Sequence, residues 1–197
     1  MRAAIIGGGA AGMYAAVMLA QAGHSVTIYE KNEKLGKKLF ITGKGRCNLT
    51  NNCEVEELMK HVVTNPKFLY SAFYNCNAQD VMQFFEQNGL ELKTERGNRV
   101  FPASDHSSDV IKTLEQALNK RRVTVRLHHT VTRILTEPVH DRMQNQMRVT
   151  GICVKDENGL QKQEHFDAVI WQPGDFPMSE PDQPEMAYSL PEILDCR

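Results

Sequence analysis

The stretch Ile5-Ile6-Gly7-Gly8-Gly9-Ala10-Ala11-Gly12 decides the fold class of this chain. An apolar run at residues 3–6 leads into it, and an alanine-rich run at residues 13–22 follows it. Gly7, Gly9 and Gly12 thus have G-x-G-x-x-G spacing between a predicted strand and a predicted helix. In such a turn the backbone can approach a pyrophosphate, and the helix N-terminus offers it free N–H groups and partial positive charge. The pattern predicts a Rossmann-like α/β domain that binds a dinucleotide.

An acidic residue follows at the distance that this interpretation requires. Residues 25–29 form a β-branched and aromatic run typical of a buried strand, and Glu30 ends it. A carboxylate at this place accepts hydrogen bonds from the ribose hydroxyls of an adenosine and repels a 2′-phosphate, so the nucleotide held here is not expected to be an NADP. The alternative is an ordinary solvated glutamate after a strand.

Composition and charge bound the remaining possibilities. The 197 residues are 41% hydrophobic and 24% charged, with a formal net charge of −1. One domain, or slightly more, is expected, with no field that would attract nucleic acid or a membrane surface, and with the cytoplasm as its location. The five scattered cysteines favour reduced thiols. His128 and His129 are neighbours at the end of a predicted strand, where they would face opposite ways, so no metal site is expected.

A long basic segment, residues 31–52, follows Glu30. Loops of this length in small domains are usually functional, and its cations could neutralise phosphate while its glycines let backbone approach a flat ring. A solvated charged loop is the alternative. Within it, Cys47 beside Arg46 is either a thiol of lowered pKa or a packing residue.

The rest of the chain alternates helical and strand patterns. Helices are predicted at 54–63, from Asn65-Pro66, at 77–89 with Asn77 and Asp80 as a capping box, and from Ser107 or Ser108 to 119. Strands are predicted at 90–94, 99–101, 123–127, 130–135 and 167–170, with a polar connection at 138–146 and a hairpin of 148–155 and 161–166. The apolar sets of the middle helices, around Phe68 and Phe84, are expected in the core rather than stacked on a cofactor.

Two further segments resemble a known family. Residues 37–51, Lys-Lys-Leu-Phe-Ile-Thr-Gly-Lys-Gly-Arg-Cys-Asn-Leu-Thr-Asn, resemble the BaiN/YhiN-like flavoproteins, also labelled aminoacetone oxidase-like FAD-binding enzymes. Residues 97–102, Gly-Asn-Arg-Val-Phe-Pro, resemble a second family segment. The resemblance covers residues 1–170.

The resemblance implies an FAD-dependent oxidoreductase of the two-dinucleotide-binding-domain flavoprotein type, with a small β-hairpin or β-meander addition and NAD(P)H as reductant. It gives no catalytic residue, and it leaves the small-molecule substrate and the oligomeric state open. By this resemblance, the adenosine half of FAD would contact Glu30 at its ribose, and Lys31 and the backbone of Val131 near its adenine. The pyrophosphate would contact Gly7, Gly9, Ala11 and Gly12, with Lys37 and Lys38 near the phosphates. The ribityl chain or flavin would contact Gly43, Gly45, Arg46 and Asn48.

The chain departs from the family pattern after residue 170. The family continues Leu-Ala-Thr-Gly-Gly, whereas this chain has Trp171-Gln172-Pro173-Gly174-Asp175, and five of its eight prolines lie after residue 170. Back-translation in a shifted frame permits the family motif, which suggests the loss of one nucleotide near Ile170–Trp171. Residues 1–170 would then be an incomplete FAD-binding domain and 171–197 a non-family tail; a genuine disordered acidic tail is the alternative. We therefore expect weak flavin binding and little turnover, with a non-catalytic nucleotide-binding fragment or a sensor of NAD as the other functions.

Overall fold

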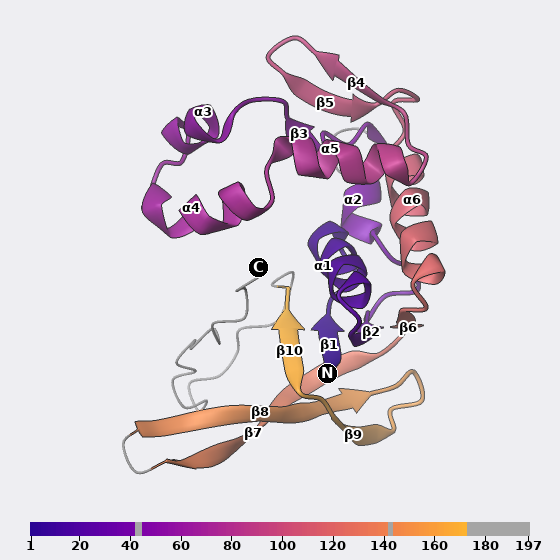
Figure 1. Ribbon diagram of the computed structural model, residues 1–197. Coiled ribbons are helices and arrows are strands. Elements are labelled where there is room, and N and C mark those ends of the chain that lie inside the picture. The colour runs from indigo at the N-terminus through magenta and orange to yellow at the C-terminus, as the bar shows by residue number, and fades with distance from the viewer. Residues whose placement is uncertain (42–44, 142–143, 173–197) are drawn as a thin grey trace.

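The computed structural model describes residues 1–41, 45–141 and 144–172 (Figure 1). The predictions for Gly43 and for the segment 173–197 lie outside the described residues. Residues 171 and 172 of the predicted tail are described, and the domain boundary at 170 stays a prediction.

A parallel sheet forms the centre of the fold. Its strands are β1 (Arg2–Ile6), β2 (Ser25–Tyr29), β6 (Thr124–Arg126) and β10 (Ala168–Trp171), in the order β10-β1-β2-β6. Ile5 pairs with Ile28 on one side and with Ile170 on the other. Strands covered on both faces are typically β-branched and apolar, which is the pattern of β1 and β2, whereas the edge strand β6 (Thr-Val-Arg) is largely exposed. The predicted Rossmann-like α/β class is confirmed.

Two helices cover one face of this sheet. α1 (Ala10–Gln21) and α6 (Ser107–Lys120) bury their apolar stripes against alternate residues of β1 and β2. The core between them contains Ile5, Val26 and Ile28 of the sheet with Met13, Val17, Leu114 and Leu118 of the helices. The helix cap predicted at Ser107 or Ser108 is wrong. His106 is the N-cap, and Ser107 is the buried first helical residue, its hydroxyl donating to the Phe40 carbonyl over 3.4 Å.

An antiparallel sheet covers the opposite face. β7 (Thr130–Asp141), β8 (Gln144–Lys155) and β9 (Gln161–His165) form this meander, which confirms the small β addition. Its buried residues pack on the other alternate set of the parallel strands, forming a second core of Ala4, Tyr29, Val131, Ile152, Val154 and Phe166. The molecule therefore has three layers: helices, parallel sheet and antiparallel sheet.

The polar connection predicted at 138–146 is wrong where the structure describes it. β7 and β8 continue through this region, and Pro138 pairs with Met147. Val139 and Met147 are both exposed, so backbone pairing rather than burial maintains this end of the hairpin. Where paired strands extend beyond the core, neither face is buried, so their sequence lacks the alternating apolar pattern from which strands are predicted.

The remaining elements form a lobe beyond the C-terminal ends of β1 and β10 (Figure 1). It contains an antiparallel sheet in the order β3-β5-β4, made of β3 (Thr50–Asn51), β5 (Arg99–Pro102) and β4 (Leu92–Glu95). Helices α3 (Val55–Lys60), α4 (Pro66–Asn75) and α5 (Ala78–Gln87) belong to the same lobe, and α2 (Lys37–Ile41) lies beside α6. The basic segment 31–52 thus carries a short helix and a strand.

The helices of this lobe differ in burial. The capping box of Asn77 and Asp80 on α5 is confirmed, and Phe84 and Phe85 are buried. On α4 the expected core position of Phe68 is wrong, because no residue of this helix is buried and Phe68 is 72% exposed. Helix α4 packs mainly against α3, so its apolar residues have the spacing of a buried face without the burial.

Candidate dinucleotide-binding site

The glycine turn after β1 has the backbone that the sequence predicts. Gly7 adopts a φ of +105°, which L side chains rarely allow, and its N–H donates to the Tyr29 carbonyl over 2.9 Å. A Cβ on Gly12 would meet the carbonyl oxygen of Gly7, so helix α1 can begin this close to β1 only with glycine there. Gly9 is the N-cap of α1 and provides no side chain to cap the helix.

Glu30 binds this turn from the end of β2. One carboxylate oxygen, Oε2, accepts from the Gly8 N–H over 2.7 Å, and Oε1 accepts from the backbone and side-chain nitrogens of Asn32 over 2.9 and 2.6 Å. Glu30 is only 8% exposed, so the alternative of a solvated glutamate is wrong. Because each carboxylate oxygen has two lone pairs, Oε2 keeps one that the Gly8 bond does not use, and its contact with a ribose hydroxyl stays a prediction.

Two other segments of the predicted site lie beside the turn. The Gly36 N–H donates to the Gly8 carbonyl over 2.8 Å, which fixes the start of α2 and its lysines Lys37 and Lys38 next to the glycines. Lys37 forms a surface ion pair with Glu33 over 3.2 Å. The His129 N–H donates to the Glu30 carbonyl over 3.0 Å, so β7 begins near the same point.

Lys31 and Lys38 are exposed, and Ala11 is an exposed residue of the first turn of α1. The side chain of Val131, by contrast, is buried in the core under the antiparallel sheet. The contacts of all four with a nucleotide stay predictions.

A residue that the sequence did not suggest lies over the turn. The Gln172 backbone N–H donates to the Ile6 carbonyl over 3.1 Å, and its side-chain Oε1 accepts from the Gly12 N–H over 2.9 Å. Atoms of Gln172 are the nearest neighbours of the space beside Gly7 and Gly9. Only its position could have identified Gln172 from the sequence. It follows β10, the neighbour of β1, at the C-terminal edge where open α/β sheets bind ligands.

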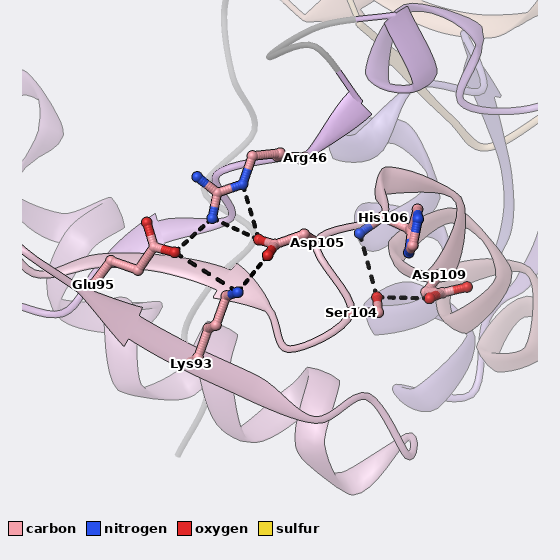
Figure 2. Close-up of polar contacts among 7 residues, drawn as sticks. All are labelled: Arg46, Lys93, Glu95, Ser104, Asp105, His106 and Asp109. Carbon is pink, nitrogen blue, oxygen red and sulfur yellow. Dashed lines mark hydrogen bonds and ion pairs between the residues drawn. The ribbon is translucent and has the colours of Figure 1, made fainter.

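Arg46, predicted near the flavin, joins the basic segment to the β4–β5 hairpin (Figure 2). Its Nε donates to Asp105 over 2.9 Å, its Nη2 pairs with Glu95 and Asp105, and its guanidinium lies 4.3 Å from the ring centroid of Phe101. Lys93 completes the cluster with a 2.5 Å bond to Asp105. Hydrogen bonds from Lys93 and then Arg46 hold the pKa of Asp105 below its usual range, and Arg46 does the same to Glu95. The structure thus places Arg46 in an ion-pair cluster, and its contact with a flavin stays a prediction.

The residues around Arg46 also contact protein groups. Gly45 has a φ of +86°, and with its amide nitrogen donating, Asn48 reaches the carbonyls of Val100 and Thr50 over 3.1 and 3.0 Å. Burial raises the pKa of the Cys47 thiol, which packs against the main core. Of the two alternatives for Cys47, the packing role is therefore supported, and the prediction of a lowered thiol pKa is wrong.

The residues present fit the phosphate part of a dinucleotide. Gly7 and Gly9 leave space at the start of α1 that a Cβ would fill, and that space now holds the Gln172 carboxamide, itself a hydrogen-bond acceptor for Gly12. Across residues 1–41, 45–141 and 144–172, no three His, Cys, Asp or Glu side chains gather closely enough to hold a metal ion. None of the helices in the described part of the chain has the length and apolar character needed to cross a bilayer.

Comparisons with known proteins agree with this architecture. The chain is 34% identical over 126 residues to the 3-dehydro-bile acid delta(4,6)-reductase of Clostridium scindens, covering 63% of this chain and 30% of that protein. It is 28% identical over 146 residues to the ribosomal RNA dihydrouridine synthase of Haemophilus influenzae, covering 74% and 34%. The chain therefore spans about a third of the length of these relatives.

A solved structure shares the fold at low sequence identity. The 3-ketosteroid delta1-dehydrogenase of Sterolibacterium denitrificans superimposes with a TM-score of 0.65 and 17% identity, over 87% of this chain and 47% of that one. Residues 1–159 match the HI0933-like protein Rossmann domain. With four fifths of its residues in that match, this chain belongs to the HI0933-like family, the family of the BaiN/YhiN-like FAD oxidoreductases.

Proposed function

We propose that this chain provides the FAD-binding part of an FAD-dependent oxidoreductase. The observation that carries the proposal is the bond between Gly8 and the buried carboxylate of Glu30, which joins the predicted pyrophosphate turn to the predicted ribose acceptor. FAD, when bound, supplies the hydride chemistry, and the protein supplies binding and orientation.

Each part of the site has a separate role in this proposal. The Gly12 N–H and the neighbouring amides of α1 would bind the pyrophosphate once the Gln172 side chain moves aside. The free lone pair of Glu30 Oε2 would accept a ribose hydroxyl, and Lys37 and Lys38 on α2 would add positive charge near the phosphates.

The relatives suggest reduction as the reaction class. One is named for a reductase acting on a bile acid, and the other for the synthesis of dihydrouridine, a reduced nucleoside, in ribosomal RNA. We propose NAD(P)H as the electron donor and a small molecule as the substrate. A net charge of −1 gives this chain little attraction for RNA phosphates.

A second candidate is nucleotide binding without turnover. The position of Arg46 favours it, because this side chain, expected beside the flavin, is paired with Glu95 and Asp105 instead.

Calorimetric titration of the purified chain with FAD, ADP, FMN and NADP tests the proposal. We expect FAD and ADP to bind with similar affinity, because both contain the adenosine and pyrophosphate groups, and we expect FMN and NADP to bind much more weakly. Glu30→Ala should abolish binding, whereas the control variant Glu157→Ala should retain it, because Glu157 is exposed in the turn between β8 and β9. Equal binding of FMN and FAD, or no binding of any adenine nucleotide, would overturn the proposal. NAD(P)H oxidation by the FAD-loaded chain separates the first candidate from the second.

A further inference from the structure

We propose that the Gln172 carboxamide occupies the position of the dinucleotide pyrophosphate and thereby sets the affinity of the glycine turn for its ligand. This inference rests on the proposed function and adds a residue to it. Gln172 Oε1 accepts from the Gly12 N–H over 2.9 Å, in the first turn of α1.

The carboxamide and a phosphate compete for the same space. A Cβ on Gly9 would lie 2.7 Å from Gln172 Nε2, and one on Gly12 would lie 2.6 Å from Oε1, so the carboxamide fills the volume that the absent side chains leave. An amide oxygen at a helix N-terminus accepts the same N–H that a phosphate oxygen would accept. The two groups therefore exclude each other at Gly12.

The competitor is held in place by the sheet. Trp171 pairs with Ile6 at the end of β10, and the Gln172 N–H donates to the Ile6 carbonyl over 3.1 Å. The Gln172 backbone is thus fixed at the glycine turn, and only side-chain rotation is needed to release Gly12. The carboxamide acts as an intramolecular ligand whose local concentration exceeds that of any free amide.

Three substitutions separate this role from a structural one. Gln172→Ala removes the competitor and should raise the affinity for ADP and FAD by roughly the worth of one hydrogen bond, about threefold to tenfold. Gln172→Asn, one methylene shorter, should act in the same direction. Gln172→Glu places a carboxylate at the helix N-terminus, so it should weaken ADP and FAD binding while raising the melting temperature of the free protein.

The experiment measures ADP and FAD affinity by calorimetry for the wild type, the three variants and Gln161→Ala, an exposed glutamine at the start of β9 that serves as a control. Amide hydrogen exchange at Gly12 gives a readout without ligand, and we expect it to be faster in Gln172→Ala. Equal ADP affinity and equal Gly12 exchange in the wild type and Gln172→Ala would overturn this inference alone. If neither protein binds an adenine nucleotide, the proposed function and this inference both fail.

Discussion

The carboxylate of Glu30 accepts a hydrogen bond from the backbone N–H of Gly8 over 2.7 Å, which ties the end of β2 to the turn after β1. The other carboxylate oxygen of Glu30 accepts hydrogen bonds from the backbone and side-chain nitrogens of Asn32. Glu30 therefore stabilises the shape of the turn as well as being the candidate ribose acceptor.

Glu30→Gln should destabilise the protein by about 1–3 kcal/mol. A glutamine offers one carbonyl oxygen in place of two carboxylate oxygens, so the N–H of Gly8 or of Asn32 would face an amino group. Urea unfolding measures the change, with Glu33→Gln as the matched control because Glu33 lies on the surface. An unchanged unfolding midpoint for Glu30→Gln would show that these bonds contribute nothing to stability.

Gly12→Ala should cost about 1–3 kcal/mol and reduce ADP affinity, because the new Cβ would meet the Gly7 carbonyl and push α1 away from β1. The matched variant is Gly23→Ala, at the other end of α1, where φ is +85° and no atom lies within 4 Å of the added Cβ. It should lower stability through backbone strain alone and leave ADP affinity unchanged. Equal affinities in the two variants would contradict the close approach at Gly12.

The ion-pair cluster around Arg46 should make stability depend on acid pH. Hydrogen bonds from Lys93 and Arg46 lower the pKa of Asp105 in the folded protein, so their contribution is present above the unfolded pKa, near 3.9, and is lost as pH falls through the folded pKa. Asp105→Asn should therefore lower the melting temperature most near neutral pH, with the difference from wild type shrinking toward about pH 3. Asparagine suits this site because it tolerates the φ of 60° at residue 105.

Melting curves from neutral to acid pH test this prediction. Glu157→Gln, an exposed residue of the turn between β8 and β9, should retain the acid profile of the wild type. A constant difference between wild type and Asp105→Asn at every pH would refute the contribution of the charge.

The two aromatic helices of the lobe should respond differently to truncation. Phe84 is 8% exposed and its ring centroid lies 4.8 Å from that of Tyr14, so Phe84→Ala should cost about 3–5 kcal/mol. Phe68, at 72% exposed, should lose less than about 0.5 kcal/mol when truncated to alanine. Chemical denaturation of both variants gives the comparison, and a large loss for Phe68→Ala would mean that α4 is covered in solution.

The features predicted well from the sequence are those that local backbone geometry demands. Gly7 has a positive φ, and Gly12 lies so close to β1 that a side chain would clash. The buried strand before Glu30 was predictable from its β-branched residues. The capping box of Asn77 and Asp80 is likewise local, and each of these signals lies within a few residues of its effect.

The features missed depend on residues far apart in the chain. Arg46 meets Asp105, and Gln172 meets Gly12, only because the sheets bring them together. The continuation of β7 and β8 beyond the core depends on pairing between strands, and the exposure of Phe68 depends on where α4 lies. Periodicity reports which face of an element is apolar, and it does not report which neighbour covers that face.

The strand order of the central sheet means that β1 can be fully paired only late in folding. Ala3 of β1 pairs with Val26 of β2 and with Ala168 of β10, so the two neighbours of the first strand come from opposite ends of the chain. During synthesis the edge of β1 that pairs with β10 stays unpaired until residue 168 has left the ribosome. Contacts this distant in sequence slow folding and lengthen the time in which a nascent chain is open to aggregation. The first strand to be made is therefore among the last to be enclosed, and the yield of native protein should depend on chaperones that shield it in the interval.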